Sequence, residues 1–221
     1  MVLMSRSGSL YFNYNKYFSE NLLAICDANK SFIYVDIGSY GQQTDGGILF
    51  NSTFGKRLDL KKINFPEPTP LPYTNISFPY FIIADSAFPL KENLLTPYAG
   101  DHLHLSDVQA NFNREQSSVR KIIENTFGIL VRRWQVFSGP IEKHPTIVEK
   151  ILKAAIVLHN YVKSFDDPAS IRYMREERIT CRTNESLTSF YEAGLQLGAA
   201  NINEYPSVAR NTYANYLMNV L

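Results

Sequence analysis

The segment Pro79-Tyr-Phe-Ile-Ile-Ala-Asp85 runs apolar and ends in a carboxylate. Such a run predicts a buried strand over residues 80–84, with Asp85 at its carboxyl end. The carboxyl edge of a sheet is where α/β proteins build their sites, so Asp85 is a candidate functional residue. The alternative is that Asp85 only caps the turn that ends the strand.

A second informative segment is Ser118-Val-Arg-Lys-Ile-Ile-Glu-Asn-Thr-Phe-Gly-Ile-Leu-Val-Arg-Arg-Trp134, which carries one acid among bases. We predict a helix that begins at Ser106 or Asp107 and ends near Trp134. On a helical projection its apolar side chains form one stripe, and Glu124 lies at the border of that stripe. Glu124 could bind a metal ion there, or it could simply pair with Arg120 one turn earlier. The same projection gathers three bases beside Glu124 into a ridge that could meet phosphates: Arg114, Lys121 and Arg132.

Composition describes an ordinary globular chain. With 221 residues, 45% hydrophobic and 19% charged, it suits one domain or one domain with extensions. The net charge of +1 gives no global attraction to nucleic acid, so DNA binding would need a local basic patch. Cys26 and Cys181 have no zinc-site spacing. No apolar run approaches the ~18–20 residues of a membrane span, and we expect an intracellular protein.

The remaining pattern predicts alternating strands and helices. Strands over residues 22–26 and 32–37 flank the turn Asp27–Lys30, and a glycine-rich loop from Gly38 to Gly47 contains Asp45. A short helix follows over residues 48–58, and the prolines between residues 66 and 79 predict a loop. Further helices are expected over residues 146–163 and 208–221, with a charged, loose tail between residues 164 and 185.

These motifs resemble a known family. Asp85-Ser-Ala-Phe-Pro-Leu90, Leu95-Thr-Pro-Tyr98, Gln109-Ala-Asn-Phe-Asn113 and the segment from Arg120 to Trp134 occur in the order seen in the DDE-superfamily nuclease domain of PIF/Harbinger transposases and their domesticated relatives. Ser7–Tyr14 and Val35–Gly47 upstream, and Ala154–Asn160 downstream, fit the same pattern. The resemblance covers roughly residues 7–162.

The resemblance implies an α/β, RNase H-like fold, with a mixed sheet flanked by helices. It implies a domain over residues 1–163 that cuts and transfers DNA strands, followed by an extension over residues 164–221 with a terminal helix. Asp45, Asp85 and Glu124 would be the catalytic residues and would bind Mg²⁺ or Mn²⁺. Arg114, Lys121 and Arg132 would contact DNA phosphates. Members of the family act in the nucleus, some with a Myb-like DNA-binding partner.

The pattern is incomplete at the N-terminus. In this family a further metal-binding aspartate lies on a first strand, just ahead of the segment that matches Ser7–Tyr14. The residues Met1–Arg6 contain no acid, so we expect that strand and its aspartate to be absent from this chain. Asp27, in a predicted turn, and Asp36, in mid-strand, are poor substitutes. Two functions stay open: a DNA endonuclease and strand-transfer domain, inactive if the missing ligand is essential, or a domesticated non-catalytic module that binds DNA or protein.

Overall fold

The computed structural model of the chain describes residues 9–13, 16, 18–100, 104–165 and 206–220. Its contacts divide the chain into two compact units. The first unit takes Met1–Thr53 and Ile122–Thr180, and the second takes Phe54–Lys121 and Cys181–Leu221. The long helix α3 (Asp107–Arg133) contributes its first half to the second unit and its second half to the first unit.

The first unit is built on a β-hairpin. Strand β1 (Glu20–Cys26) pairs antiparallel with β2 (Phe32–Tyr40), with Ala24 opposite Val35. The turn closes as its sequence predicts, because the Asp27 carboxylate accepts a hydrogen bond from the Ser31 N–H at 2.8 Å. A 3₁₀ turn, η1 (Ser9–Tyr11), precedes the hairpin, and helix α1 (Asp45–Asn51) follows it.

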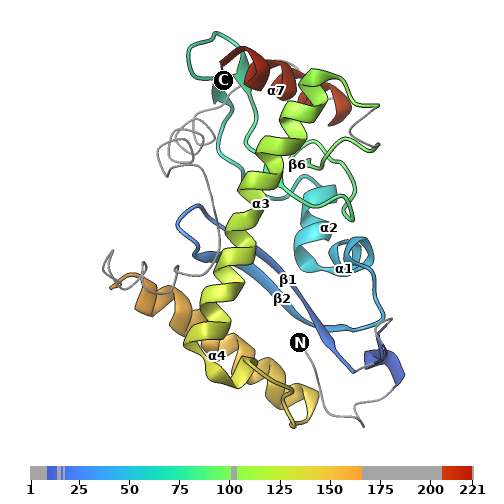
Figure 1. Cartoon of the computed structure of the whole chain (residues 1–221), viewed down its shortest axis with the longest axis vertical. Helices are drawn as coiled ribbons and strands as arrows, with labels where there is room; N and C mark the ends of the chain where they lie inside the picture. The colour runs from blue at the N-terminus through green and yellow to red at the C-terminus, as the bar shows by residue number, and fades with distance from the viewer. Residues whose placement is uncertain (1–8, 14–15, 17, 101–103, 166–205, 221) are drawn as a thin grey trace. The chain divides into compact units, whose positions relative to one another are not determined.

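Helix α4 (Pro145–Lys163) packs against β2, as Figure 1 shows. The Asn160 side chain accepts from the Phe32 N–H at 2.9 Å and donates to the Phe32 carbonyl at 2.8 Å. This side-chain amide thus forms the two backbone hydrogen bonds that a neighbouring strand would otherwise form with Phe32. His159 is fully buried, its Nε2 lies 2.9 Å from the Lys30 carbonyl, and its ring meets Phe32 edge-on. His159 is therefore a packing residue.

A 3₁₀ turn, η2 (Gln135–Phe137), follows α3 in the chain. The buried core of the first unit comprises Phe32, Leu130, Leu152, Ala155 and Ile156.

The second unit holds two short strand pairs and a helical cover. Strands β3 (Thr69–Pro70) and β4 (Ser77–Phe78) pair antiparallel, and β5 (Ile82–Ile83) pairs parallel with β6 (Leu94–Leu95). Helix α2 (Thr53–Asp59) precedes them, and α7 (Pro206–Val220) lies beside the first turns of α3 (Figure 1). The core is rich in aromatic rings: Phe78, Phe112 and Tyr213 are all buried and in contact.

The predicted helices over residues 106–134, 146–163 and 208–221 are confirmed as α3, α4 and α7. The helix predicted over residues 48–58 starts earlier, at Asp45, and is broken at Ser52. The Ser52 hydroxyl donates to the Leu49 carbonyl at 2.7 Å and so ends α1. The proline-rich segment 66–79, predicted as a loop, contains the short β3–β4 pairing.

The strand predicted over residues 80–84 is shorter than expected. Pro79 precedes it and a turn follows it at once, since the Phe88 N–H bonds to the Asp85 carbonyl at 3.0 Å. These two boundaries leave only Ile82 and Ile83 as strand residues. The α/β class is confirmed in coarse terms, but the described residues form three two-stranded sheets and not one mixed sheet. The domain boundary after residue 163 stays a prediction, and residues 166–185 of the expected loose tail lie outside the described ranges.

Among the helices that the structure describes, none combines the length and the apolar character that crossing a membrane requires.

Candidate functional site

Asp85 lies two residues beyond the carboxyl end of β5 (Ile82–Ile83). The Ala84 N–H still bonds to the Leu95 carbonyl at 2.9 Å, and the chain then turns at Asp85. The side chain is 38% exposed, so it faces solvent while its backbone is fixed to a buried neighbour. The structure thus places Asp85 at the strand end, as its sequence context predicts.

Helix α3 holds this strand end with an amide side chain. Gln116 is 3% exposed, and its Nε2 donates to the Ala84 carbonyl at 3.0 Å and to the Leu95 carbonyl at 3.2 Å. One side chain therefore bridges the ends of both parallel strands, immediately before Asp85. Sequence reasoning missed this residue. The signal was present, because Gln116 falls inside the apolar stripe of the helical projection, where a polar residue requires a partner.

Two further polar side chains fix the loop that follows β6. Asn113 accepts from the Tyr98 N–H at 2.8 Å and donates to the Tyr98 carbonyl at 3.0 Å. From α7, the Arg210 guanidinium donates to the carbonyls of Thr96 and Pro97 at 3.2 and 3.0 Å, and it lies 3.9 Å from the centre of the Tyr98 ring. The segment after β6 is thereby attached to both α3 and α7.

Both oxygens of the Asp85 carboxylate have a partner. Oδ2 forms an ion pair with Arg120 of α3, whose side chain is 31% exposed, and Oδ1 accepts a hydrogen bond from the Ser86 hydroxyl at 2.9 Å. Desolvation works to raise the pKa of Asp85, but the Ser86 hydroxyl, the Arg120 guanidinium and two backbone N–H groups outweigh it and lower the pKa. Asp85 is consequently an anion at neutral pH.

Glu124 and Asp45 are exposed members of the first unit. The alternative that Glu124 pairs with Arg120 is not what the structure shows, because Arg120 pairs with Asp85; within the described ranges Glu124 has no ion pair. Asp45 is the first residue of α1, behind the N-cap Thr44, whose hydroxyl accepts from the Gly47 N–H at 3.3 Å. An acidic side chain in the first turn stabilises a helix by its interaction with the helix dipole, so Asp45 also has a structural role in α1.

The donor chemistry of Asp45, Asp85 and Glu124 suits a hard divalent cation, since all three offer carboxylate oxygens with access to solvent. Over the parts of the chain that the structure describes, however, no three His, Cys, Asp or Glu side chains come together as a metal site. Of these three residues, Asp85 has both carboxylate oxygens engaged, one of them by a cationic side chain.

The three basic residues of the predicted ridge, Arg114, Lys121 and Arg132, are all exposed on α3. Arg114 is partly neutralised, because its Nε donates to Glu115 at 3.1 Å and its guanidinium also contacts Asn111. Lys121 and Arg132 lie about three helical turns apart on the same side of α3. Each is an exposed base, which suits contact with a phosphate oxygen.

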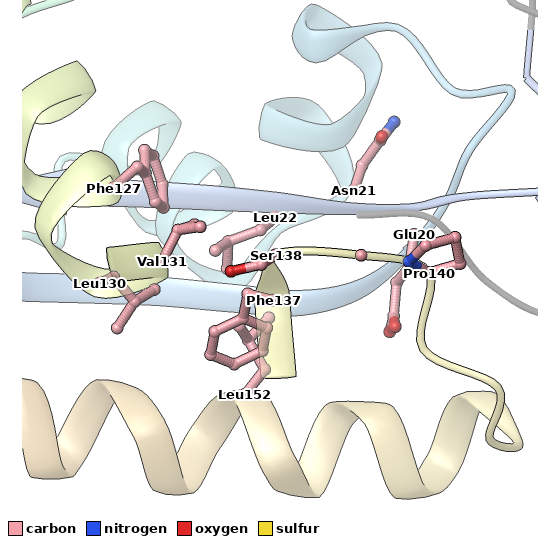
Figure 2. A pocket seen from close by; sticks show the side chains of 11 residues that line it. Glu20, Asn21, Leu22, Phe127, Leu130, Val131, Phe137, Ser138, Pro140 and Leu152 are labelled. Carbon is pink, nitrogen blue, oxygen red and sulfur yellow. The ribbon is translucent and has the colours of Figure 1, made fainter. Parts of the chain in front are cut away.

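The first unit has a pocket of about 590 Å³ between β1, the end of α3 and α4 (Figure 2). Its walls are mostly apolar, with Leu22, Phe127 and Leu152 among them. Glu20 also lines it, and its side chain points from β1 toward α4. Glu20 is 2% exposed, and burial, reinforced by the nearby Glu149 carboxylate, raises its pKa to about 7. Both acids approach Gly38, and Glu149 forms an ion pair with Lys153 at 3.2 Å.

Residues 3–160 match the protein family described as DDE superfamily endonuclease. The chain belongs to the DDE superfamily endonuclease family. The match takes in every predicted site residue, and the resemblance to PIF/Harbinger-type transposase-derived proteins is confirmed.

Two curated relatives support this assignment of the DDE superfamily domain. The chain is 30% identical to the "Protein ALP1-like" of Arabidopsis thaliana over 73% of its own length and 39% of that protein. It is 24% identical to the human "Putative nuclease HARBI1" over 68% of its own length and 39% of that protein. The chain therefore spans about two fifths of the length of these relatives. No solved structure matches it.

Proposed function

We propose that this chain is the nuclease domain of a Harbinger-type transposase-derived protein, acting on DNA phosphodiester bonds. The family membership supports the reaction class. The structural observation that carries the proposal is the Gln116 contact, since it fixes the carboxyl ends of β5 and β6 and presents an ionised Asp85 just beyond them. A rigid backbone behind a solvent-accessible carboxylate is what a metal-dependent phosphodiester site requires.

Within this proposal the domain is RNase H-like, and Asp45, Asp85 and Glu124 bind Mg²⁺ or Mn²⁺. Such a cation, when bound, would lower the cost of deprotonating the attacking water or 3′-hydroxyl and of expelling the leaving oxygen. At Asp85 the protein's own contribution is to hold the carboxylate ionised and oriented, through Ser86 and Arg120. Arg114, Lys121 and Arg132 offset the charge of the DNA backbone.

The whole protein's partners and location are part of the same proposal. DNA is the substrate, a Myb-like DNA-binding protein is a partner, and the nucleus is the place of action, as in the resembling family. The chain spans only 39% of the length of the relatives that it matches, so DNA recognition can involve further parts of such proteins.

A second candidate function is a domesticated, non-catalytic module that binds DNA or protein. The ion pair between Arg120 and Asp85 favours it, because a carboxylate neutralised by a guanidinium is a weaker metal ligand. The exposed bases of α3 would serve this function equally well.

Nicking of supercoiled plasmid by the purified chain in Mn²⁺ distinguishes the two functions. We expect Asp85→Asn and Glu124→Gln each to slow nicking about a hundredfold or more, because even misplacement of a catalytic group costs about that much. Asp59→Asn is the matched control, since Asp59 is an ion-paired aspartate of the second unit outside the predicted site. Retained DNA binding without metal-dependent nicking would establish the non-catalytic module instead.

A further inference from the structure

Arg120, which pairs with Asp85, lies on the same side of α3 as the residues that bind the ends of β5 and β6. Asn113, Gln116 and Arg120 follow one another at intervals of three and four residues, so they lie on one side of α3. The first two bind backbone groups of the second unit, and the third binds the Asp85 carboxylate. The contacts that fix the strand ends relative to α3 therefore also place the Arg120 guanidinium next to Asp85.

The ion pair is not needed to hold the loop. The backbone on either side of Asp85 is already fixed by Gln116, by the Ala84–Leu95 hydrogen bond and by the turn between Asp85 and Phe88. What Arg120 adds is a positive charge on one carboxylate oxygen, at a site that is about one third exposed. A guanidinium is a permanent cation, so wherever Asp85 is ionised the pair persists unless something replaces it.

A divalent cation and a guanidinium compete for the same carboxylate. Mg²⁺ and Mn²⁺ bind carboxylate oxygens directly and at short range, and a fixed positive charge at that distance repels them. With Oδ1 engaged by Ser86 and Oδ2 by Arg120, a metal ion meets both a repulsive charge and an occupied oxygen.

We propose that Arg120 is the built-in counter-ion of Asp85 and must leave the carboxylate before a divalent cation binds there. The inference rests on the proposed function, in that Asp85 is taken as a metal-binding carboxylate. It adds a step to that function. Without metal, Arg120 neutralises the Asp85 carboxylate, and metal binding requires Arg120 to move away. Arg120 is thus a positioning residue that acts through Asp85.

Mn²⁺ binding to the full chain without DNA, followed by the electron paramagnetic resonance signal of unbound Mn²⁺, tests the proposal. We expect Arg120→Gln to bind Mn²⁺ at least about tenfold more tightly than the wild type, because a neighbouring charge changes the affinity of a carboxylate for a cation by such factors. Arg120→Lys keeps the charge and should stay near the wild type. Asp85→Asn added to Arg120→Gln should remove the gain.

Lys91→Gln is the matched control. Lys91 forms an ion pair with Asp59 in the same unit, the exposed fractions being 24% and 40% against 31% and 38% for Arg120 and Asp85. This variant loses the same net charge and uncovers a similar aspartate, so it should leave Mn²⁺ affinity unchanged. An equal gain in Lys91→Gln would make the effect one of general charge and overturn the proposal.

The remaining outcomes separate this proposal from the proposed function. If Asp85→Asn weakens Mn²⁺ binding but Arg120→Gln does not strengthen it, Asp85 is a metal ligand and Arg120 is not its counter-ion. If Asp85→Asn changes nothing in any background, Asp85 is not a ligand and both ideas fail.

If Arg120→Gln does not fold, the nuclear magnetic resonance signal of the Arg120 Nε–H group in the wild type is measured instead. Mg²⁺ should shift that resonance toward its position in Asp85→Asn, and an unmoved resonance would contradict the proposal.

Discussion

At the scale of single residues, Glu20 and Asp85 show opposite electrostatic behaviour. The pKa of Asp85 is lowered from its ordinary value of 3.8, so the stability that Asp85 contributes is present at neutral pH and is lost only as the pH falls through that lowered value. The pKa of Glu20 is raised from 4.5 to about 7. Its contribution is complete below 4.5 and is lost as the pH rises through about 7.

This sign gives a prediction for Glu20→Gln. Between about pH 4.5 and 7 the wild type should lose stability as the pH rises, whereas the variant should not show this loss. Above pH 7 the variant should be more stable by at most about 3 kcal/mol, because it avoids a buried charge beside Glu149. Chemical denaturation across this pH range measures the difference.

Among the titratable groups of the described residues, Glu149 and Lys153 of α4 and Tyr11 of η1 act on Glu20, and all three stay in place in that variant. Glu142→Gln is the control, since Glu142 is exposed on the loop before α4. A pH slope that Glu20→Gln leaves unaltered would show that another group titrates in this window.

At the scale of elements, the glycine-rich loop after β2 packs very closely, at Gly41, against Ser19 and Tyr11. A Cβ on Gly41 would lie 2.4 Å from the Ser19 Oγ and 2.6 Å from the backbone carbonyls of both Ser19 and Tyr11. A side chain could turn away, but two backbone oxygens cannot do so without moving the start of β1. The loop sequence therefore requires glycine at this position for lack of space.

We predict that Gly41→Ala lowers the free energy of unfolding by about 1–3 kcal/mol, as overpacking in a fixed site does. Gly128→Ala is the matched comparison, because Gly128 lies inside α3 and a Cβ added there would meet nothing within 4 Å. That substitution should stabilise the protein by up to about 1 kcal/mol through helix propensity. Urea denaturation of both variants measures the contrast, and equal effects would refute it.

The elements also show what a sequence can and cannot predict. Helices α3 and α4 were predictable because a long apolar period specifies each of them locally, and Ser106 or Asp107 marks the start of α3. The ends of β5 were not, because they depend on contacts with Leu95 and Gln116, distant along the chain. Nor was the partner of Arg120, since a local rule favours Glu124 one turn away, while the folded chain supplies Asp85.

At the scale of the whole molecule, charge is nearly balanced, with 22 basic and 21 acidic residues. Any attraction to DNA must therefore come from where the bases lie and not from their number. Lys121 and Arg132 are exposed on one long helix, so α3 is a candidate element for phosphate contact.

Joint substitution of Lys121 and Arg132 by glutamine should weaken DNA binding and lower the slope of log affinity against log salt by about two, because each base neutralises roughly one phosphate. Fluorescence anisotropy with a short duplex between about 50 and 200 mM salt measures this slope. Lys62→Gln with Lys150→Gln removes the same charge from exposed positions outside α3. If both double variants lose affinity equally, α3 is not the DNA-binding surface.

The three contacts from one face of α3 have a consequence for changes in chain length. Inserting one residue between Asn113 and Gln116 would rotate everything beyond it by about 100°, and so detach either the Tyr98 loop or the strand ends. Four inserted residues would restore the direction to within about 40° but displace it along the axis by about 6 Å. Neither change can be absorbed locally. This stretch of helix is a spacer of fixed length, so additions to the second unit have to be accommodated in its loops.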